Sequence, residues 1–262
     1  MRQAKAFTII ELLVCVAIIA LLMGIVLPAL GRARDAARTA IELSAARQLA
    51  IGYVAHAAEQ RGRLLPGYAH EPAHDGFNNP VTPPANARYP WRLARYVNHQ
   101  VRGCILVNEQ EKLAEGYDPA SPGDWYYAIS VNPSFGLNQY YLGGDLVNPG
   151  PRTWLTRLDD AARPSDLITF ASARYNAGYT AAGFFRVEAP TGSINNITGW
   201  SAAYDEGASA HTWGFVHPRH DGRAAFAMLD GHAALLDTQD MRDMRRWANQ
   251  AALVGDPDWT PF

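Results

Sequence analysis

The hydrophobic positions of this 262-residue chain are densest near its N-terminal end. Residues 12–30 form an apolar run of 19 residues without a charge, and one carboxylate, Glu11, directly precedes it. A helix rises ~1.5 Å per residue, so the run covers about 28 Å, close to the ~30 Å hydrocarbon core of a bilayer. A charged side chain within a bilayer is costly. The pattern therefore predicts a membrane-length helix whose carboxylate has a partner.

The apolar pattern continues beyond this run but narrows to one side. Residues 31–62 predict an Ala-rich amphipathic continuation of the helix, with apolar residues at four-residue spacing on one face: Ile41, Ala45, Leu49, Tyr53 and Ala57. Gly62 and the Pro66-Gly67 pair predict its end. Such a face is typical of a helix that packs on a sheet, and the alternative is a stalk carrying an unrelated domain.

The rest of the chain predicts short elements joined by loops. Prolines interrupt residues 66–124, where short helices are predicted at 91–97 and 108–114. Alternating stretches at 125–131, 167–173 and 183–187 predict strands, and residues 117–145, rich in Asn, Gly and Tyr, predict ordered surface loops. Asp230-Gly231 predicts a hairpin over 224–236 with a type I′ turn, in which both turn residues have positive φ.

Composition narrows the class of protein. The 232 residues after the apolar run are enough for one domain with its own core. A formal net charge of −2 and the lack of a Lys/Arg run exclude an electrostatic surface for nucleic acid. Cys15 lies in the apolar run and Cys104 lies far from it, so we expect no intramolecular disulfide.

The first 31 residues allow four interpretations. Arg2 and Lys5 suit a secretory signal peptide, but the apolar run exceeds the ~7–15 residues typical of one and follows a carboxylate. A lipoprotein signal would need a small residue before Cys15, where Val14 stands. A plain single-pass anchor is the third interpretation. In the fourth, residues 6–11, Ala-Phe-Thr-Ile-Ile-Glu, resemble the type IV prepilin/pseudopilin signal.

This resemblance implies a processing and assembly pathway. Prepilin peptidase would cleave between Ala6 and Phe7, with Ala in place of the usual Gly, and Phe7 would become the methylated N-terminus. Glu11 and Pro28 would then be the fifth and twenty-second residues, as is typical of the family. The Phe7 amine of a neighbouring subunit would pair with Glu11 in a low-dielectric medium and set the axial register.

A second resemblance lies near the other end of the chain. His220, nine intervening residues and Asp230-Gly231 resemble the H-X9-DG segment of many prepilin-like proteins. Residues 62–66, 132–138 and 241–247 match neighbouring stretches of that pattern loosely.

The same region holds the densest group of potential metal ligands, namely His217, His220, Asp221, Asp230 and His232. These residues suit Zn²⁺ better than Ca²⁺, which prefers oxygen ligands. The interpretation we adopt is structural: His220 binds a loop backbone and Asp230-Gly231 makes the turn, so no cofactor is expected. Catalytic motifs are missing, and an enzymatic alternative would be a hydrolase built on His211, His217 and His220.

We therefore expect an α+β, pilin-like fold with four parts: a leader (1–6), a transmembrane and filament-core helix (7–30), its amphipathic continuation (31–62) and a globular domain outside the cytoplasmic membrane (63–262). Basic residues flank the apolar run on both sides, so this topology follows from the resemblance alone. The expected function is a non-enzymatic subunit of a type II secretion pseudopilus or type IV pilus-like filament. Its partners would be prepilin peptidase, other subunits and an assembly platform. The alternative is a single-pass, membrane-anchored binding or enzymatic domain that does not polymerise.

Overall fold

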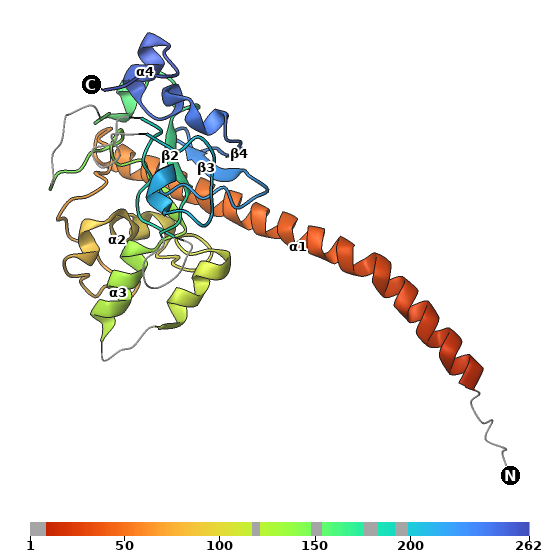
Figure 1. Cartoon of the computed structure of the whole chain (residues 1–262). Helices are drawn as coiled ribbons and strands as arrows, with labels where there is room; N and C mark the ends of the chain where they lie inside the picture. Colours follow the sequence, from red (N-terminus) through yellow and green to blue (C-terminus); the bar gives the residue numbers. More distant parts are fainter. Residues whose placement is uncertain (1–8, 117–120, 148–153, 176–182, 192–198, 262) are drawn as a thin grey trace. The chain divides into compact units, whose positions relative to one another are not determined.

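The computed structural model describes residues 9–116, 121–147, 154–175, 183–191 and 199–261. The chain divides into two compact units, Met1–Ala40 and Ile41–Phe262. Helix α1 (Ile9–Glu59) provides the described part of the first unit and the opening of the second (Figure 1). The prediction of one continuous helix is therefore confirmed, and the helix ends close to Gly62. Gly62 has a φ of 84°, and its N–H donates to the carbonyl of Ala57 over 2.7 Å, as at a left-handed helix terminus.

The buried side of α1 within the second unit starts at Glu42. Leu49, Tyr53 and the alanines between Ala45 and Ala57 along this side are buried, as their spacing predicts. Ile41 was predicted to join them, but it is 45% exposed. At ~100° per residue, the buried positions centre on a line through Glu42, Leu49 and Tyr53, and Ile41 lies about 100° away from that line.

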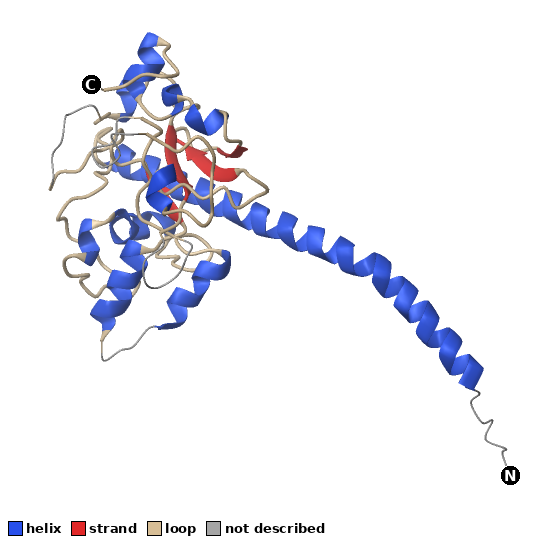
Figure 2. Cartoon of the chain, viewed as in Figure 1, coloured by secondary structure: helices blue, strands red, loops and turns tan. Residues whose placement is uncertain are grey.

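Four antiparallel strands form one sheet in the order β1-β2-β3-β4 (Figure 2). These strands are β1 (Phe135–Leu137), β2 (Ile168–Ser172), β3 (Ala224–Met228) and β4 (Ala233–Leu236). Phe135 pairs with Ser172, and β2 meets β3 with a register shift between Ile168 and Phe170. The strand predicted over 167–173 and the hairpin predicted over 224–236 are both confirmed.

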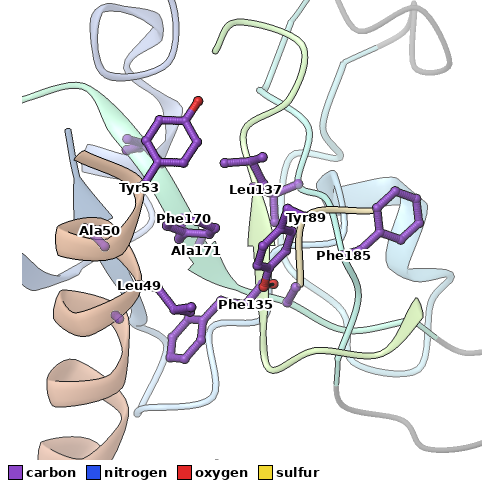
Figure 3. Packing of buried hydrophobic residues seen from close by; sticks show 14 of the residues in the cluster. Leu49, Ala50, Tyr53, Tyr89, Phe135, Leu137, Phe170, Ala171 and Phe185 are labelled. Carbon is purple, nitrogen blue, oxygen red and sulfur yellow. Dashed lines mark hydrogen bonds between the residues drawn. The ribbon is translucent and has the colours of Figure 1, made fainter. Parts of the chain in front are cut away.

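The second part of α1 packs on this sheet through aromatic and aliphatic side chains. Figure 3 shows Leu49 and Tyr53 beside Phe170 of β2. The Tyr53 and Phe170 rings meet edge to face with centroids 5.9 Å apart, and the Tyr53 hydroxyl donates to the carbonyl of Leu65 over 3.0 Å. Small alanines between the large side chains allow close approach of helix and sheet. The α+β prediction is confirmed, and the arrangement is consistent with a pilin-like fold.

Short helices surround the sheet. The described α-helices after α1 are α2 (Tyr89–Ala94), α3 (Pro122–Val131) and α4 (Asn249–Val254). The 3-10 turns lie at Ala85–Ala87, Arg95–Val97, Asn108–Gly116, Leu158–Asp160, Ala210–Trp213, Asp240–Arg242 and Met244–Arg246. The helices predicted at 91–97 and 108–114 are confirmed, the second as a 3-10 helix.

Helix α3 corrects the prediction of a strand over 125–131. Pro122 lies in its first turn, where a missing N–H costs nothing, and Asp124 places a negative charge at the positive end of the helix. Tyr126, Ile129 and Ser130 are buried at helical spacing. The short apolar run alternates as a strand would, but these start signals favour a helix.

The strand predicted over 183–187 is also wrong. This stretch meets β1 at one bridge, between Leu137 and Arg186, with hydrogen bonds from Leu137 N–H to Phe185 and from Val187 N–H to Leu137, each 3.0 Å. The next N–H, of Glu188, donates instead to Gly214. The backbone therefore leaves the sheet after one bridge.

The surface-loop prediction for 117–145 is wrong for its described part. This part contains α3 and β1, and its polar residues Asn132, Ser134 and Asn138 are buried. The Asn138 side-chain amide donates to the carbonyls of Ile168 (3.0 Å) and Trp247 (2.9 Å). Asn138 therefore joins the 132–138 and 241–247 segments to β2.

Candidate functional site

The first unit presents an apolar surface. In its described part the large apolar side chains are exposed, from Ile9 at 81% to Leu30 at 45%. Within the described residues, α1 is the helix that is long and apolar enough to cross a membrane, judged by length and composition. Burying apolar area stabilises by roughly 25 cal/mol per Å², so such a surface favours lipid or other protein over water.

Two of the predicted assembly residues lie on this helix. Glu11 is in the first turn, where a negative charge complements the helix dipole, and Pro28 lies inside the helix. Proline has no N–H to donate and its ring crowds the carbonyl four residues earlier, which is that of Gly24. The helix is therefore weakened around these two residues. The predicted cleavage site, Ala6 and Phe7, lies outside the described residues.

The second unit holds a buried carboxylate that the sequence analysis did not single out. Glu42 on α1 is 2% exposed. His220 Nε2 lies 2.7 Å from its Oε2, and Arg219 Nε lies 3.2 Å from its Oε1. The hydroxyl of Ser172 on β2 and the amide of Asn108 each donate to Glu42 over 3.2 Å. We call these five residues the Glu42 cluster.

Electrostatics hold Glu42 in its ionised form. Burial alone would raise its pKa, but Arg219, His220 and the hydrogen bond from Asn108 lower it from 4.5 to about 2. Arg219 is fixed in turn, because its Nη2 donates to the carbonyl of Ser134 over 2.9 Å. The cluster therefore ties α1 to β2 and to the segment before β3 with a charge-assisted network.

The predicted metal ligands do not converge. His220 contacts Glu42, whereas His232 Nδ1 lies 2.7 Å from Asp230 Oδ1. His217 is half-buried beside Arg219 and Arg174, and partial burial with these charges lowers its pKa to about 3. Among the described residues, no group of three or more His, Cys, Asp or Glu is arranged to hold a metal ion. Asp221 has a positive φ of 53° in the turn before β3.

His220 has a structural contact that the sequence did not identify, because its side chain binds the Glu42 carboxylate. A hydrogen bond from this side chain to a loop backbone stays a prediction. Its backbone N–H donates to the carbonyl of Arg223 over 2.9 Å, which shapes the turn before β3. The His211 ring, part of the enzymatic alternative, packs edge to face on Phe215 with centroids 5.3 Å apart.

The hairpin turn also differs from the predicted type I′. The N–H of Gly231 donates to Met228, and the N–H of Met228 donates to His232. Gly231 has a φ of 94°, but Asp230 does not have the positive φ that a type I′ turn requires. The Asp230 carboxylate accepts a hydrogen bond from the N–H of His232. This is a three-residue loop that ends in a left-handed glycine, a common hairpin connection. Whether His220 and Asp230-Gly231 form an H-X9-DG segment in the family sense stays a prediction.

Comparison with known proteins supports the N-terminal resemblance. Residues 1–27 match the family model of the prokaryotic N-terminal methylation motif. A search of curated proteins and a search of solved structures each gave no match. Together with the apolar helix, the motif indicates a type IV prepilin-like protein that is processed by prepilin peptidase and associated with a membrane.

Proposed function

We propose that this chain is a non-enzymatic structural subunit of a type II secretion pseudopilus or type IV pilus-like filament. The observation that carries the proposal is the methylation motif over residues 1–27, followed by a helix whose apolar side chains are exposed from Ile9 to Leu30. In a membrane these side chains would contact lipid. In a filament they would contact the same helix of neighbouring subunits.

The first step of the proposed pathway is cleavage between Ala6 and Phe7 by prepilin peptidase. The cut removes residues 1–6 and leaves a free α-amine on Phe7, whose methylation preserves its positive charge. Residues 7–30 then anchor the chain in the cytoplasmic membrane as a single pass, with residues 63–262 on the outer side. An assembly platform would extract the subunit from the membrane into a helical filament.

Glu11 would guide the docking of each new subunit. Two opposite charges 4 Å apart attract with about 4 kcal/mol at an effective dielectric constant of about 20, against about 1 kcal/mol in water. The Phe7 amine of one subunit and Glu11 of a neighbour would therefore prefer each other inside a bundle of apolar helices. Because Leu, Ile and Val contacts allow many axial offsets, this pair would select one register.

The weak stretch around Gly24 and Pro28 would serve assembly by letting the helix loosen as subunits pack.

The Glu42 cluster would serve assembly by keeping α1 attached to the sheet. Force applied to α1 during extraction would load the contact between its second part and the sheet, where Glu42 is bound to His220 and Ser172. A charged network that spans helix, strand and loop resists that load.

Replacement of Glu11 tests the proposal. Glu11→Gln keeps the shape and hydrogen-bonding capacity of the side chain, and Glu11→Leu removes both. We expect both variants to be cleaved and inserted in the membrane, as judged by mass and fractionation, yet to assemble at least about tenfold less than the parent chain, which corresponds to about 1.4 kcal/mol of lost contact energy. Glu59→Gln is the matched control, since it removes one carboxylate from the other end of α1, where Glu59 is exposed.

Filaments are counted by electron microscopy and by cross-linking in cells that express each variant as the only copy. Parent-like filaments from Glu11→Leu would overturn the charge-pair mechanism. A parent chain that is anchored but never assembles would favour a membrane-anchored binding or enzymatic domain instead.

A further inference from the structure

A cationic pocket opens in the second unit beside the C-terminal end of α1. Its volume is about 550 Å³, within the range of pockets that bind small molecules. The charged and titratable side chains on its wall include His56, Arg63, Glu71, Arg92, Arg95 and His99. They come from α1, from the segment after it and from the α2 region. Filament formation as proposed above makes no use of this pocket.

Arg92 provides a fixed cation in the pocket wall. Its side chain is 2% exposed, and its Nη2 donates to the carbonyls of Pro66 (2.7 Å), Gly67 (3.0 Å) and Ala87 (3.1 Å). Its Nη1 lies 3.3 Å from the Glu71 carboxylate, whose side chain is 44% exposed. The backbone therefore holds the guanidinium in place, while Glu71 is bound on one side and open to solvent on the other.

The charges around the pocket do not cancel. Glu71 pairs with Arg92, and Glu59 pairs with Arg95, which also contacts the hydroxyl of Tyr96. Arg63 is exposed and makes no ion pair among the residues that the structure describes. Three arginines thus face two carboxylates, which leaves one positive charge before any histidine is protonated.

Two of the three histidines that line the pocket, His56 and His99, add hydrogen-bonding groups to this excess charge. The Nδ1 atoms of His56 and His99 are buried without a hydrogen-bond partner. Neither imidazole ring makes a hydrogen bond within the described part of the chain, and both residues line the pocket. The His56 ring is held by edge-to-face packing on Tyr96, with centroids 5.5 Å apart. Its pKa is lowered by burial.

We propose that this pocket binds a small molecule that carries an oxyanion, either a phosphate or a carboxylate group. Arginine offers paired N–H donors that match both groups, and a neutral or charged imidazole donates to either. Pro72, which is exposed, and Tyr96, which is half-buried, line the same pocket and suit the carbon part of such a ligand.

The test uses the full chain in detergent micelles and calorimetric titration with three probes: inorganic phosphate, glycerol 3-phosphate and succinate. Arg63→Gln removes the cation that lacks an ion pair. His56→Phe removes the imidazole nitrogens of His56 but keeps an aromatic ring that packs on Tyr96. Arg102→Gln is the matched control, because Arg102 is exposed, does not line the pocket and lies 3.9 Å from Glu115 in a weak surface pair.

We expect at least one probe to bind, with a dissociation constant that rises about tenfold in each pocket variant and changes less than about twofold in Arg102→Gln. Phosphate and succinate distinguish the two oxyanions. The absence of binding by all three probes up to about 10 mM, or equal affinity of parent chain and pocket variants, would overturn the proposal. Tryptophan fluorescence confirms that each variant is folded. The titration does not depend on assembly, so its failure is separate from a failure of the filament proposal.

Discussion

Replacing Glu42 by Gln tests whether charge, and not shape alone, holds α1 on the sheet. The substitution keeps the volume of the side chain but removes the negative charge that faces Arg219 and His220. It leaves the Arg219 guanidinium, which is 16% exposed, without its counter-charge. Breaking a buried ion pair in this way is more costly than replacing both partners.

The size of the effect follows from the pKa of Glu42. A fall from 4.5 to about 2 corresponds to about 3 kcal/mol of extra stability at neutral pH, at about 1.4 kcal/mol per pKa unit. The folded chain releases this proton more readily than the unfolded chain. The stabilisation is therefore complete above about pH 4.5 and is lost as the pH falls towards about 2.

Urea unfolding of the full chain in detergent, followed by tryptophan fluorescence, measures this contribution. All seven tryptophans lie after residue 90, so the signal reports on the second unit. We expect Glu42→Gln to lower the free energy of unfolding by about 3 kcal/mol at neutral pH and by less than about 1 kcal/mol near pH 2.

Glu59→Gln is the control for this comparison. Glu59 lies on the same helix, but its pair with Arg95 is more than half exposed on both sides, so its loss should cost less than about 1 kcal/mol. Equal losses for Glu42→Gln at both pH values would show that shape and not charge is responsible. A loss below about 1 kcal/mol at neutral pH would refute the ionic role of the cluster.

Two further predictions concern the region around the hairpin. Gly231→Ala should lower the free energy of unfolding by about 1–2 kcal/mol in the same assay, because Gly231 has a φ of 94°. An added Cβ would lie 3.4 Å from Ile51 Cγ1, which is an ordinary contact, so no steric clash adds to the backbone strain. A much larger loss of unfolding free energy would contradict an origin in backbone strain. His217 should stay neutral at pH 5 in NMR spectra, because burial beside Arg219 lowers its pKa to about 3. Below about pH 6.5 His217 is protonated in the unfolded chain and neutral in the folded chain, so lowering the pH favours unfolding. A His217 ring that titrates near pH 6.5 in the folded chain would contradict its burial beside Arg219.

Elements with strong local signals were predictable from the sequence. The uncharged run and the four-residue spacing of Ala45, Leu49 and Tyr53 predict α1, and Asp230-Gly231 predicts the hairpin because a turn needs a residue that tolerates positive φ. Local signals also misled. Residues 125–131 alternate like a strand, and the deciding features, Pro122 and Asp124, lie just before them.

The Glu42 cluster was not predicted, because its partners are far apart in sequence. His220 is 178 residues from Glu42, and Ser172 is 130 residues away. One signal was present: Glu42 lies on the same helical side as Leu49 and Tyr53, so a carboxylate stands in line with buried residues. Such a position predicts a buried counter-charge, although it does not identify the residue that supplies it.

The N-terminus of the mature chain tests the central proposal most directly. Intact mass and N-terminal peptide analysis of the protein from its native envelope measure where the chain begins. The proposal predicts loss of residues 1–6 and a methylated Phe7. A chain that begins at Arg32, or one that keeps its first six residues, would contradict it.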